Sequence, residues 1–162
     1  MSTTTSPRHL SPEQSDPERS DPGQPNRELL LGALSHQGPE AAMAALDTHY
    51  SADFVRHGDK ADYTRDQLRE GLGRLYRGFP DLVRTHSDVI VQGDRAAYRW
   101  EAHGTHLGDY LGVRATRRPV LARGIVMCRF AEGRIVEEWA SWNKAGLLHD
   151  LGIIPLGRED VR

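Results

Sequence analysis

The spacing of hydrophobic residues changes once along the chain. Up to about residue 80, apolar residues recur three and four positions apart, and after that point they alternate with polar residues. The first pattern is typical of amphipathic helices and the second of strands with one buried face. The sequence therefore predicts helices in its first half and a sheet in its second.

Three helices are expected before the change of period. Asn26 and Thr64 have side chains that commonly cap helix N-termini, and Gly38-Pro39 breaks one helix and begins the next. The expected segments are a helix from Asn26 to Gly38, a second from Pro39 to Tyr50, a short extended or irregular piece at 51–60, and a third helix from Arg65 to about Arg77.

Four long strands and a closing helix are expected after residue 80. Turn residues separate the strands at Gly93-Asp94-Arg95 and Glu132-Gly133. The expected segments are strands at 82–92, 96–106, 119–130 and 134–143, followed by a short helix at 147–151. This order predicts an α+β fold, in which a curled antiparallel sheet packs against the N-terminal helices around an apolar pocket.

The first 25 residues differ in composition from the rest of the chain. Pro7, Pro12, Pro17 and Pro22 recur every five residues in a segment that is almost free of apolar side chains. Such a segment cannot bury enough surface to offset its ordering entropy, so residues 1–25 are expected to form a disordered tail. The folded domain is expected over 26–155, with a C-terminal tail at 156–162.

Charge and cysteine content narrow the classes of function. The formal net charge of −2 gives no basic field that would favour nucleic acid or an anionic membrane. The single cysteine, Cys128, allows no intramolecular disulfide, which fits a reducing cytosol. No apolar run is long enough for a transmembrane helix or a signal peptide. A cytoplasmic protein without nucleic-acid or membrane partners is expected.

Several short segments, taken in order and spacing, resemble the SnoaL-like polyketide cyclase family. They are Ala52–His57, Phe79–Leu82, Gly93–Arg95, Gly104–Gly108 with Leu111-Gly112, Arg129-Phe130 and Gly133–Gly152. The resemblance implies the cone-shaped fold of nuclear transport factor 2 and ketosteroid isomerase, a pocket that works without a cofactor, and often a homodimer. Members of that family close rings in aromatic polyketides by intramolecular aldol condensation.

Two positions depart from the family's pattern. The family usually has an acid/base aspartate four residues after the strand tryptophan, where this chain has Asn143. An amide orients and donates hydrogen bonds but does not transfer protons near neutral pH. The loop that usually reads Pro-Thr-Gly is Ala115-Thr116-Arg117-Arg118 here, which changes the residues at the expected pocket mouth.

Three residues are candidates for catalysis. His57 matches the family's early histidine, and an imidazole is the side chain most often used as acid or base near neutral pH; the alternative is a loop or partly buried histidine bonded to backbone. Asn143 and Glu137 share one face of the last strand. Asn143 would stabilise an enolate or, alternatively, cap the following helix. Glu137 would supply a base or, alternatively, pair with an arginine.

Five further residues are candidates for substrate binding: Trp139, Tyr98, His106, Arg99 and Arg123. Trp139 would stack on a planar substrate, or simply pack in the core. The arginines would bind a carboxylate or phenolate, or form ion pairs on the outer sheet face, and His106 would contact substrate or hold its loop. His103 and His106 fall on opposite strand faces, and no metal-binding motif stands out, so no metal site is expected.

The resemblance and these residues predict a cofactor-independent cyclase of secondary metabolism, such as antibiotic biosynthesis, that acts on a polyketide-type intermediate. Alternatives are an epoxide hydrolase, hydratase or isomerase on the same scaffold, and a small-molecule-binding protein without catalytic activity. Trp139 and Trp142 lie at opposite parity on the last strand, so both sheet faces carry apolar residues. A homodimer across the outer sheet face would cover them.

Overall fold

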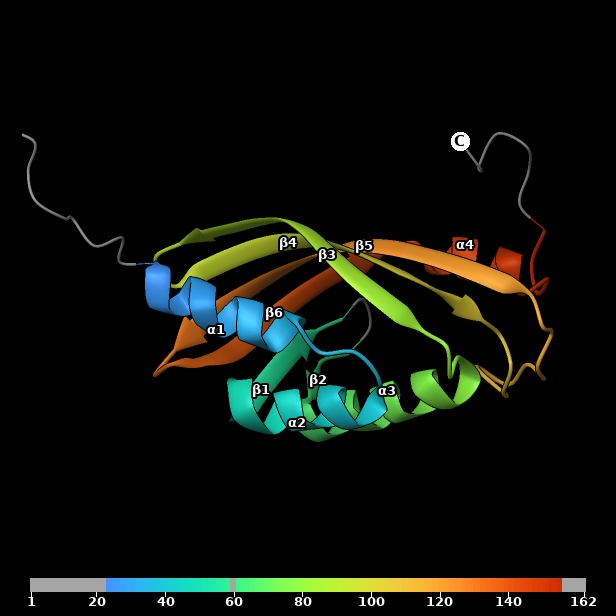
Figure 1. Cartoon of the computed structure of the whole chain (residues 1–162), viewed down its shortest axis with the longest axis horizontal. Helices are drawn as coiled ribbons and strands as arrows, with labels where there is room; N and C mark the ends of the chain where they lie inside the picture. Colours follow the sequence, from blue (N-terminus) through green and yellow to red (C-terminus); the bar gives the residue numbers. More distant parts are fainter. Residues whose placement is uncertain (1–22, 59–60, 156–162) are drawn as a thin grey trace, which may run out of the picture.

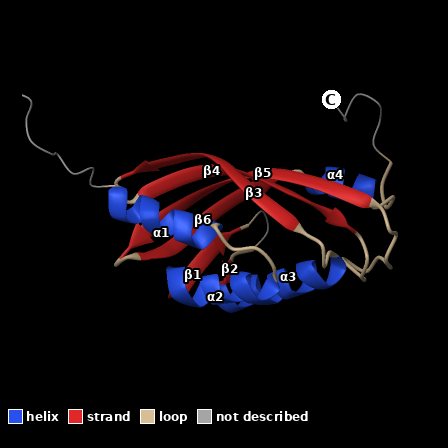
Figure 2. Cartoon of the chain, in the orientation of Figure 1, coloured by secondary structure: helices blue, strands red, loops and turns tan. Residues whose placement is uncertain are grey.

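The computed structural model describes residues 23–58 and 61–155. Residues 1–22 of the predicted tail 1–25, and the C-terminal tail at 156–162, lie outside the described residues, whereas Gln24 and Pro25 belong to a helix and not to a tail. Within the described part, three helices and a sheet form two layers, and a fourth helix follows the last strand (Figures 1 and 2). The α+β prediction is confirmed. The elements are α1 Gln24–Leu34, α2 Pro39–His49, β1 Tyr50–His57, β2 Tyr63–Thr64, α3 Arg65–Gly78, β3 Val83–Gln92, β4 Arg95–Thr105, β5 Pro119–Ala131, β6 Arg134–Trp142 and α4 Lys144–Asp150.

The first helix begins earlier than the sequence predicted. Its N-cap is Gly23, and Pro25 lies in the first turn, where a missing backbone N–H is tolerated. Asn26 is therefore inside the helix and is not its cap; its Nδ2 donates to the carbonyl of Gly93, 2.9 Å away. This bond ties α1 to the turn between β3 and β4.

The third helix begins where the sequence predicted. The Thr64 hydroxyl accepts from the backbone N–H of Gln67, and the Gln67 side chain accepts from the backbone N–H of Thr64. This reciprocal capping box satisfies two of the N–H groups that a helix start leaves unpaired. None of the helices within 23–58 and 61–155 has the length and apolar character needed to cross a membrane.

The sheet is mixed, whereas the sequence predicted an antiparallel one. The four long strands β3 to β6 form the expected antiparallel meander, but β1 pairs in parallel with β6. With β2, the order within the described residues is β2-β1-β6-β5-β4-β3. The register of β1 shifts between Tyr50 and Val55, so its buried residues do not alternate regularly. For that reason the segment did not show the period of a strand.

One β-bulge decides which side chains of β6 face inward. Phe130 of β5 pairs with Ile135, and Arg129 pairs with Glu137, so Val136 is an extra residue in β6. An extra residue reverses the parity of the strand beyond it. Ile135 and Glu138 are both fully buried on the inner face, whereas Glu137 lies on the outer face.

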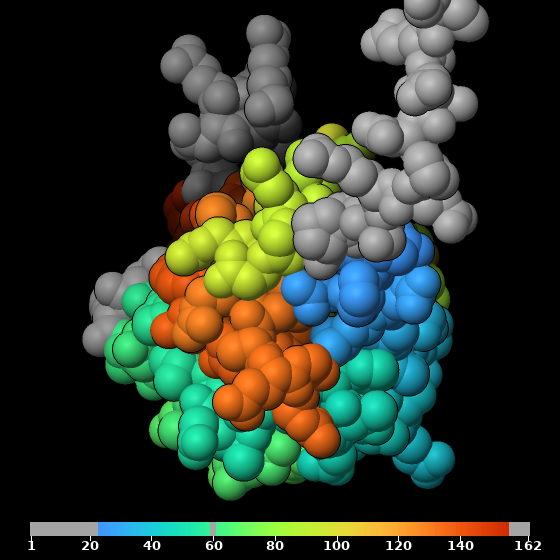
Figure 3. All heavy atoms as spheres, turned by 90° about the vertical axis from the view of Figure 1, so that its left-hand side faces the viewer, coloured from blue at the N-terminus to red at the C-terminus, as the bar shows by residue number. Residues whose placement is uncertain are grey.

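The helices cover the inner, concave face of the sheet. Leu30 of α1 packs in one buried cluster with Phe130 and Ile135, near the turn between β5 and β6. Figure 3 shows this end of the molecule, with α1 in blue beside that turn in orange. A second cluster joins Phe79 to Leu147 of α4.

Candidate functional site

A cavity of about 600 Å³ lies between the concave face of the sheet and the helices. Side chains of α1, α2 and α3 form one wall and side chains of β3 to β6 form the other. Its apolar lining includes Leu34, Ala42, Leu46, Leu68, Leu72, Leu75, Phe79, Leu82, Val120 and Val126. A concave space of this size, with both apolar and polar side chains in its walls, is suited to a small organic ligand.

Two tryptophans form part of the sheet wall of the cavity. Trp100 of β4 pairs with Gly124 of β5, and Gly124 pairs with Trp142 of β6, so all three lie on the inner face. The two indole rings are tilted with centroids 6.3 Å apart. A Cβ on Gly124 would lie 2.7 Å from the Trp100 ring, so the absence of a side chain lets the indole lie across the strand.

A buried carboxylate anchors the polar part of the cavity. Glu138 is fully buried; its Oε1 accepts from the Tyr50 hydroxyl at 2.9 Å, and its Oε2 accepts from Arg56 Nε at 3.0 Å. Arg56 Nη2 donates to the same oxygen. Burial would lower the pKa of Arg56, but the Glu138 carboxylate raises it overall. The pair therefore fixes a charged guanidinium and a phenol, both of which line the cavity.

His86 and Tyr98 face the cavity from neighbouring strands. Their rings meet edge to face with centroids 5.6 Å apart, and His86 Nε2 is buried without a hydrogen-bond partner. Burial, together with the nearby cation of Arg84, lowers the pKa of His86 to about 4, so this imidazole is neutral at pH 7. Burial also raises the pKa of Tyr98, which keeps its phenol protonated.

Three of the predicted site residues meet on the outer face of the sheet. His57 stacks on Trp139 with ring centroids 4.8 Å apart, and its Nε2 is 3.7 Å from Glu137 Oε1. Its Nδ1 lies 3.2 Å from the Asp62 carboxylate. His57 also contributes to the cavity rim, but Glu137 and Trp139 do not line the cavity. The expectation that they line it is wrong, because the bulge at Val136 turns their face outward.

Glu137 belongs to an ion pair on that outer face. Its Oε2 accepts from Arg129 Nε at 2.6 Å. This hydrogen bond, with the charges of Arg129 and His57, lowers the pKa of Glu137. A carboxylate held in this way is a weak base, and its position matches the arginine-paired alternative that the sequence left open.

Asn143 and His106 occupy structural positions. Asn143 is the N-cap of α4, where its Oδ1 accepts from the backbone N–H of Gly146 at 2.8 Å, and it does not line the cavity. His106 is fully buried, and its Nδ1 accepts from the backbone N–H of Thr116 at 3.2 Å. Both side chains adopt the alternatives named from the sequence, the helix cap and the loop support.

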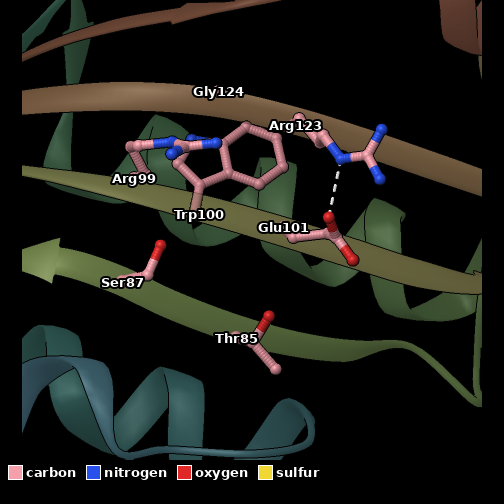
Figure 4. A pocket seen from close by; sticks show the side chains of 7 residues that line it. All are labelled: Thr85, Ser87, Arg99, Trp100, Glu101, Arg123 and Gly124. Atoms are coloured by element: carbon pink, nitrogen blue, oxygen red, sulfur yellow. Dashed lines mark hydrogen bonds and ion pairs between the residues drawn. The ribbon is translucent and has the colours of Figure 1, made fainter.

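Arg99 and Arg123 lie on the outer face, beside a shallow depression of about 180 Å³ (Figure 4). Arg99 Nη1 donates to Asp88 Oδ2 at 3.0 Å, and Arg123 Nε donates to Glu101 Oε2 at 2.6 Å. Each arginine is more than half exposed and already paired. They do not reach the large cavity, whereas Tyr98 does line it.

Sequence reasoning missed Arg56, which lines the cavity, and Glu138, which is buried behind it. Arg56 directly precedes the candidate His57, and the buried Glu138 directly follows the candidate Glu137. The sequence alone carries no signal for Glu138, because the extra residue at Val136 that turns Glu138 inward is shown only by the pairing of β6 with β5. Among the described residues, no group of three or more His, Cys, Asp or Glu side chains is placed to hold a metal ion.

The chain is similar to a known protein family and to several solved structures. Residues 31–151 match the model of a family described as SnoaL-like polyketide cyclase. The structure of AclR from Streptomyces galilaeus, provisionally named a hydroxylase, has 25% sequence identity and a TM-score of 0.74, covering 82% of this chain and 99% of that chain. No curated protein matches the chain.

Two further solved structures have the same fold. IdmH from Streptomyces antibioticus, provisionally named a polyketide cyclase, has 27% identity and a TM-score of 0.63, covering 82% of this chain and 99% of that chain. A protein from Jannaschia sp. CCS1, provisionally named a SnoaL-like polyketide cyclase, has 19% identity and a TM-score of 0.75, covering 85% and 99%. At 19% identity the last likeness shows the fold alone, which is that of nuclear transport factor 2.

Proposed function

Because the chain belongs to the SnoaL-like polyketide cyclase family, we propose that it closes a ring in a polyketide-type intermediate of secondary metabolism. The observation that carries the proposal is the cavity of about 600 Å³, in which apolar and aromatic walls surround a small group of polar side chains. Holding a flexible chain folded in such a space brings two of its carbons together, which contributes several kcal/mol to catalysis.

The polar side chains of the cavity supply acid/base chemistry without an added cofactor. His86 is neutral at pH 7 and its Nε2 has no hydrogen-bond partner, so we assign it the proton transfer; a pKa of about 4 makes it a weak base, which suits only the acidic carbon between two carbonyls of a polyketide chain. The resulting enolate attacks a second carbonyl of the same chain, and His86 returns the proton to the new alkoxide. The product is an isomer of the substrate, with the ring bond formed and no atom lost.

Charge that develops on oxygen during these steps needs donors at fixed positions. Arg56 is held by Glu138 and keeps an Nη1 group free of that carboxylate, and Tyr98 retains its phenolic proton. Both line the cavity, so we assign them to the oxygen of the enolate and of the alkoxide. Trp100 and Trp142 would hold the planar parts of the substrate.

Replacing His86 with glutamine is expected to lower the rate of ring closure by about 100-fold or more, because a general acid/base group typically contributes that much. The rate is measured by high-resolution mass spectrometry of products from a panel of polyketide intermediates, each against a boiled control. His103→Gln is the matched control: this exposed histidine lies on the outer face of β4, and its loss should leave the rate unchanged.

The masses of the products decide between the reactions open to this scaffold. A product of unchanged mass supports ring closure, whereas a gain of one water contradicts it and indicates hydrolysis. A gain of one oxygen atom indicates hydroxylation, and tight binding without any product indicates a binding protein. Hydrolysis would call for a carboxylate directed at a water, and the described residues that line the cavity include no aspartate or glutamate.

We further propose that the protein is a homodimer that pairs through the outer sheet face. Leu121, Ile125, Met127 and Trp139 are each at least 37% exposed, and the strand register places them on that face. Arginines and carboxylates alternate among them. An apolar area with paired charges suits a second copy of the same surface.

Light scattering after size exclusion is expected to give twice the chain mass of 18.1 kDa for the unmodified protein. Ile125→Glu places an unpaired charge in the centre of this face and should shift the mass to that of one chain. Ile90→Glu changes an even more exposed residue near the far end of β3 and serves as control. A monomeric unmodified protein would contradict the proposal.

A further inference from the structure

The charges on the cavity wall have one sign. The described lining residues include no carboxylate. They include four cationic side chains, which are Arg56, Arg74, Arg84 and Lys144. Arg56 is neutralised by Glu138 from behind the wall, and Arg74 lies 3.7 Å from Glu70 on the exposed side of α3. Lys144 is exposed at the start of α4. Arg84 is the remaining cation.

Arg84 is fixed on the inner face of β3. It pairs with Ala102 of β4, which is buried on that face, and it is itself half-buried. The side chain of Gln37, between α1 and α2, bonds its backbone on both sides: Nε2 donates to the Arg84 carbonyl at 2.6 Å, and Oε1 accepts from the Arg84 N–H at 3.3 Å. None of the ion pairs within 23–58 and 61–155 includes Arg84.

The neighbours of Arg84 do not balance its charge. His86 lies two residues along the same face, roughly 7 Å away in an extended strand. Burial and then the charge of Arg84 lower the pKa of His86 to about 4, and the same charge opposes the rise that burial causes in the pKa of Tyr98. At neutral pH both rings are uncharged, so this region of the cavity keeps a net positive charge. A half-buried cation beside apolar walls is stabilised by an anion that enters with the ligand.

We propose that the cavity binds a planar anionic ligand, with its carboxylate on Arg84 and its ring system against Trp100 and Trp142. The register supports this geometry, because His86 pairs directly with Trp100 and Arg84 lies next along the same face. The identification of this ligand as the substrate rests on the proposed function. If the ligand is the substrate, the anion site at Arg84 narrows the substrate to a polyketide acid with a free carboxylate, rather than an ester or a neutral ketone.

Isothermal titration calorimetry with 2-naphthoate and 2-naphthamide tests the proposal without any need for turnover. The two probes share a ring system and differ in charge, and the unmodified protein should bind the carboxylate more tightly. Arg84→Gln should weaken naphthoate binding by about tenfold or more, as expected for loss of a charge-assisted hydrogen bond. Naphthamide binding should not change, which also shows that the variant is folded. Arg99→Gln, on the outer face, should alter neither affinity.

Arg84→Lys keeps the charge but loses the two-pronged geometry, so it should retain part of the preference for naphthoate. The proposal is overturned if the unmodified protein binds naphthoate no more tightly than naphthamide, if it binds neither, or if Arg84→Gln keeps the full preference. The turnover assay is scored separately. An Arg84-dependent preference without product would refute ring closure alone, and ring closure of neutral intermediates without that preference would refute the anion site alone.

Discussion

Replacing Glu138 with glutamine is expected to lower the free energy of unfolding by about 3 kcal/mol, since removal of one partner leaves the other charge buried and unpaired. The fully buried Glu138 carboxylate is the anion bonded to Arg56, whose side chain is 29% exposed. Glutamine keeps the shape of the side chain and an oxygen for the Tyr50 hydroxyl, so the loss reports mainly on the charge. Urea denaturation followed by circular dichroism measures it.

The adjacent glutamate provides the matched control. Glu137 pairs with Arg129 on the outer face, where solvent screens the pair, so Glu137→Gln should cost much less. The double variant Arg56→Met with Glu138→Gln removes both charges, keeps an acceptor for the Tyr50 hydroxyl, and should recover most of the stability that Glu138→Gln alone loses. Equal losses for Glu137→Gln and Glu138→Gln would contradict the buried position of Glu138.

A methyl group at Gly124 is expected to lower the free energy of unfolding by about 2 kcal/mol, as overfilling a packed region does. The added Cβ would lie 2.6 Å from the Ser141 carbonyl oxygen and 2.7 Å from the Trp100 ring, so the indole has to move. Trp100 is part of the aromatic wall, so Gly124→Ala should also change tryptophan fluorescence and weaken binding of 2-naphthamide. Denaturation and fluorescence spectra measure the two effects.

Gly71→Ala is the control for this substitution. Gly71 lies in α3, and a Cβ there would meet only Arg74 at 3.9 Å. Alanine is the better helix former, so this variant should gain about 0.5–1 kcal/mol. A loss at Gly71 as large as the loss at Gly124 would show that glycine replacement in general, rather than contact with Trp100, is responsible.

Much of the fold follows from local signals in the sequence. The capping box at Thr64, the breaks at Gly38-Pro39 and the alternation in β4 each depend on residues close together in the chain. The start of α1 and the role of β1 do not. Gly23 and Pro25 compete with Asn26 as signals for the start of the helix. The segment β1 becomes a strand only because β6 lies beside it.

The site was less predictable for a related reason. Strict alternation from the buried Ile135 puts Glu137 and Trp139 inside the cone, and a single extra residue at Val136 reverses this result. The identity of the inward carboxylate thus depends on pairing between strands, which a count along one strand does not reveal. Alternation does hold along β4, because the whole of this strand pairs with β5 without such a shift, and Tyr98, a candidate from the sequence, lines the cavity.

The parallel pairing of β1 with β6 sets the order in which the chain can assemble. The bonds from Glu138 to Arg56 and Tyr50 join residues that are 82 and 88 positions apart. Contacts at such separation form slowly, because the intervening chain must be ordered first. During synthesis on the ribosome, α1, α2 and β1 therefore emerge well before β6, the strand beside which β1 lies. Their apolar surfaces stay exposed until the last strand arrives, and surfaces exposed in this way during folding favour aggregation.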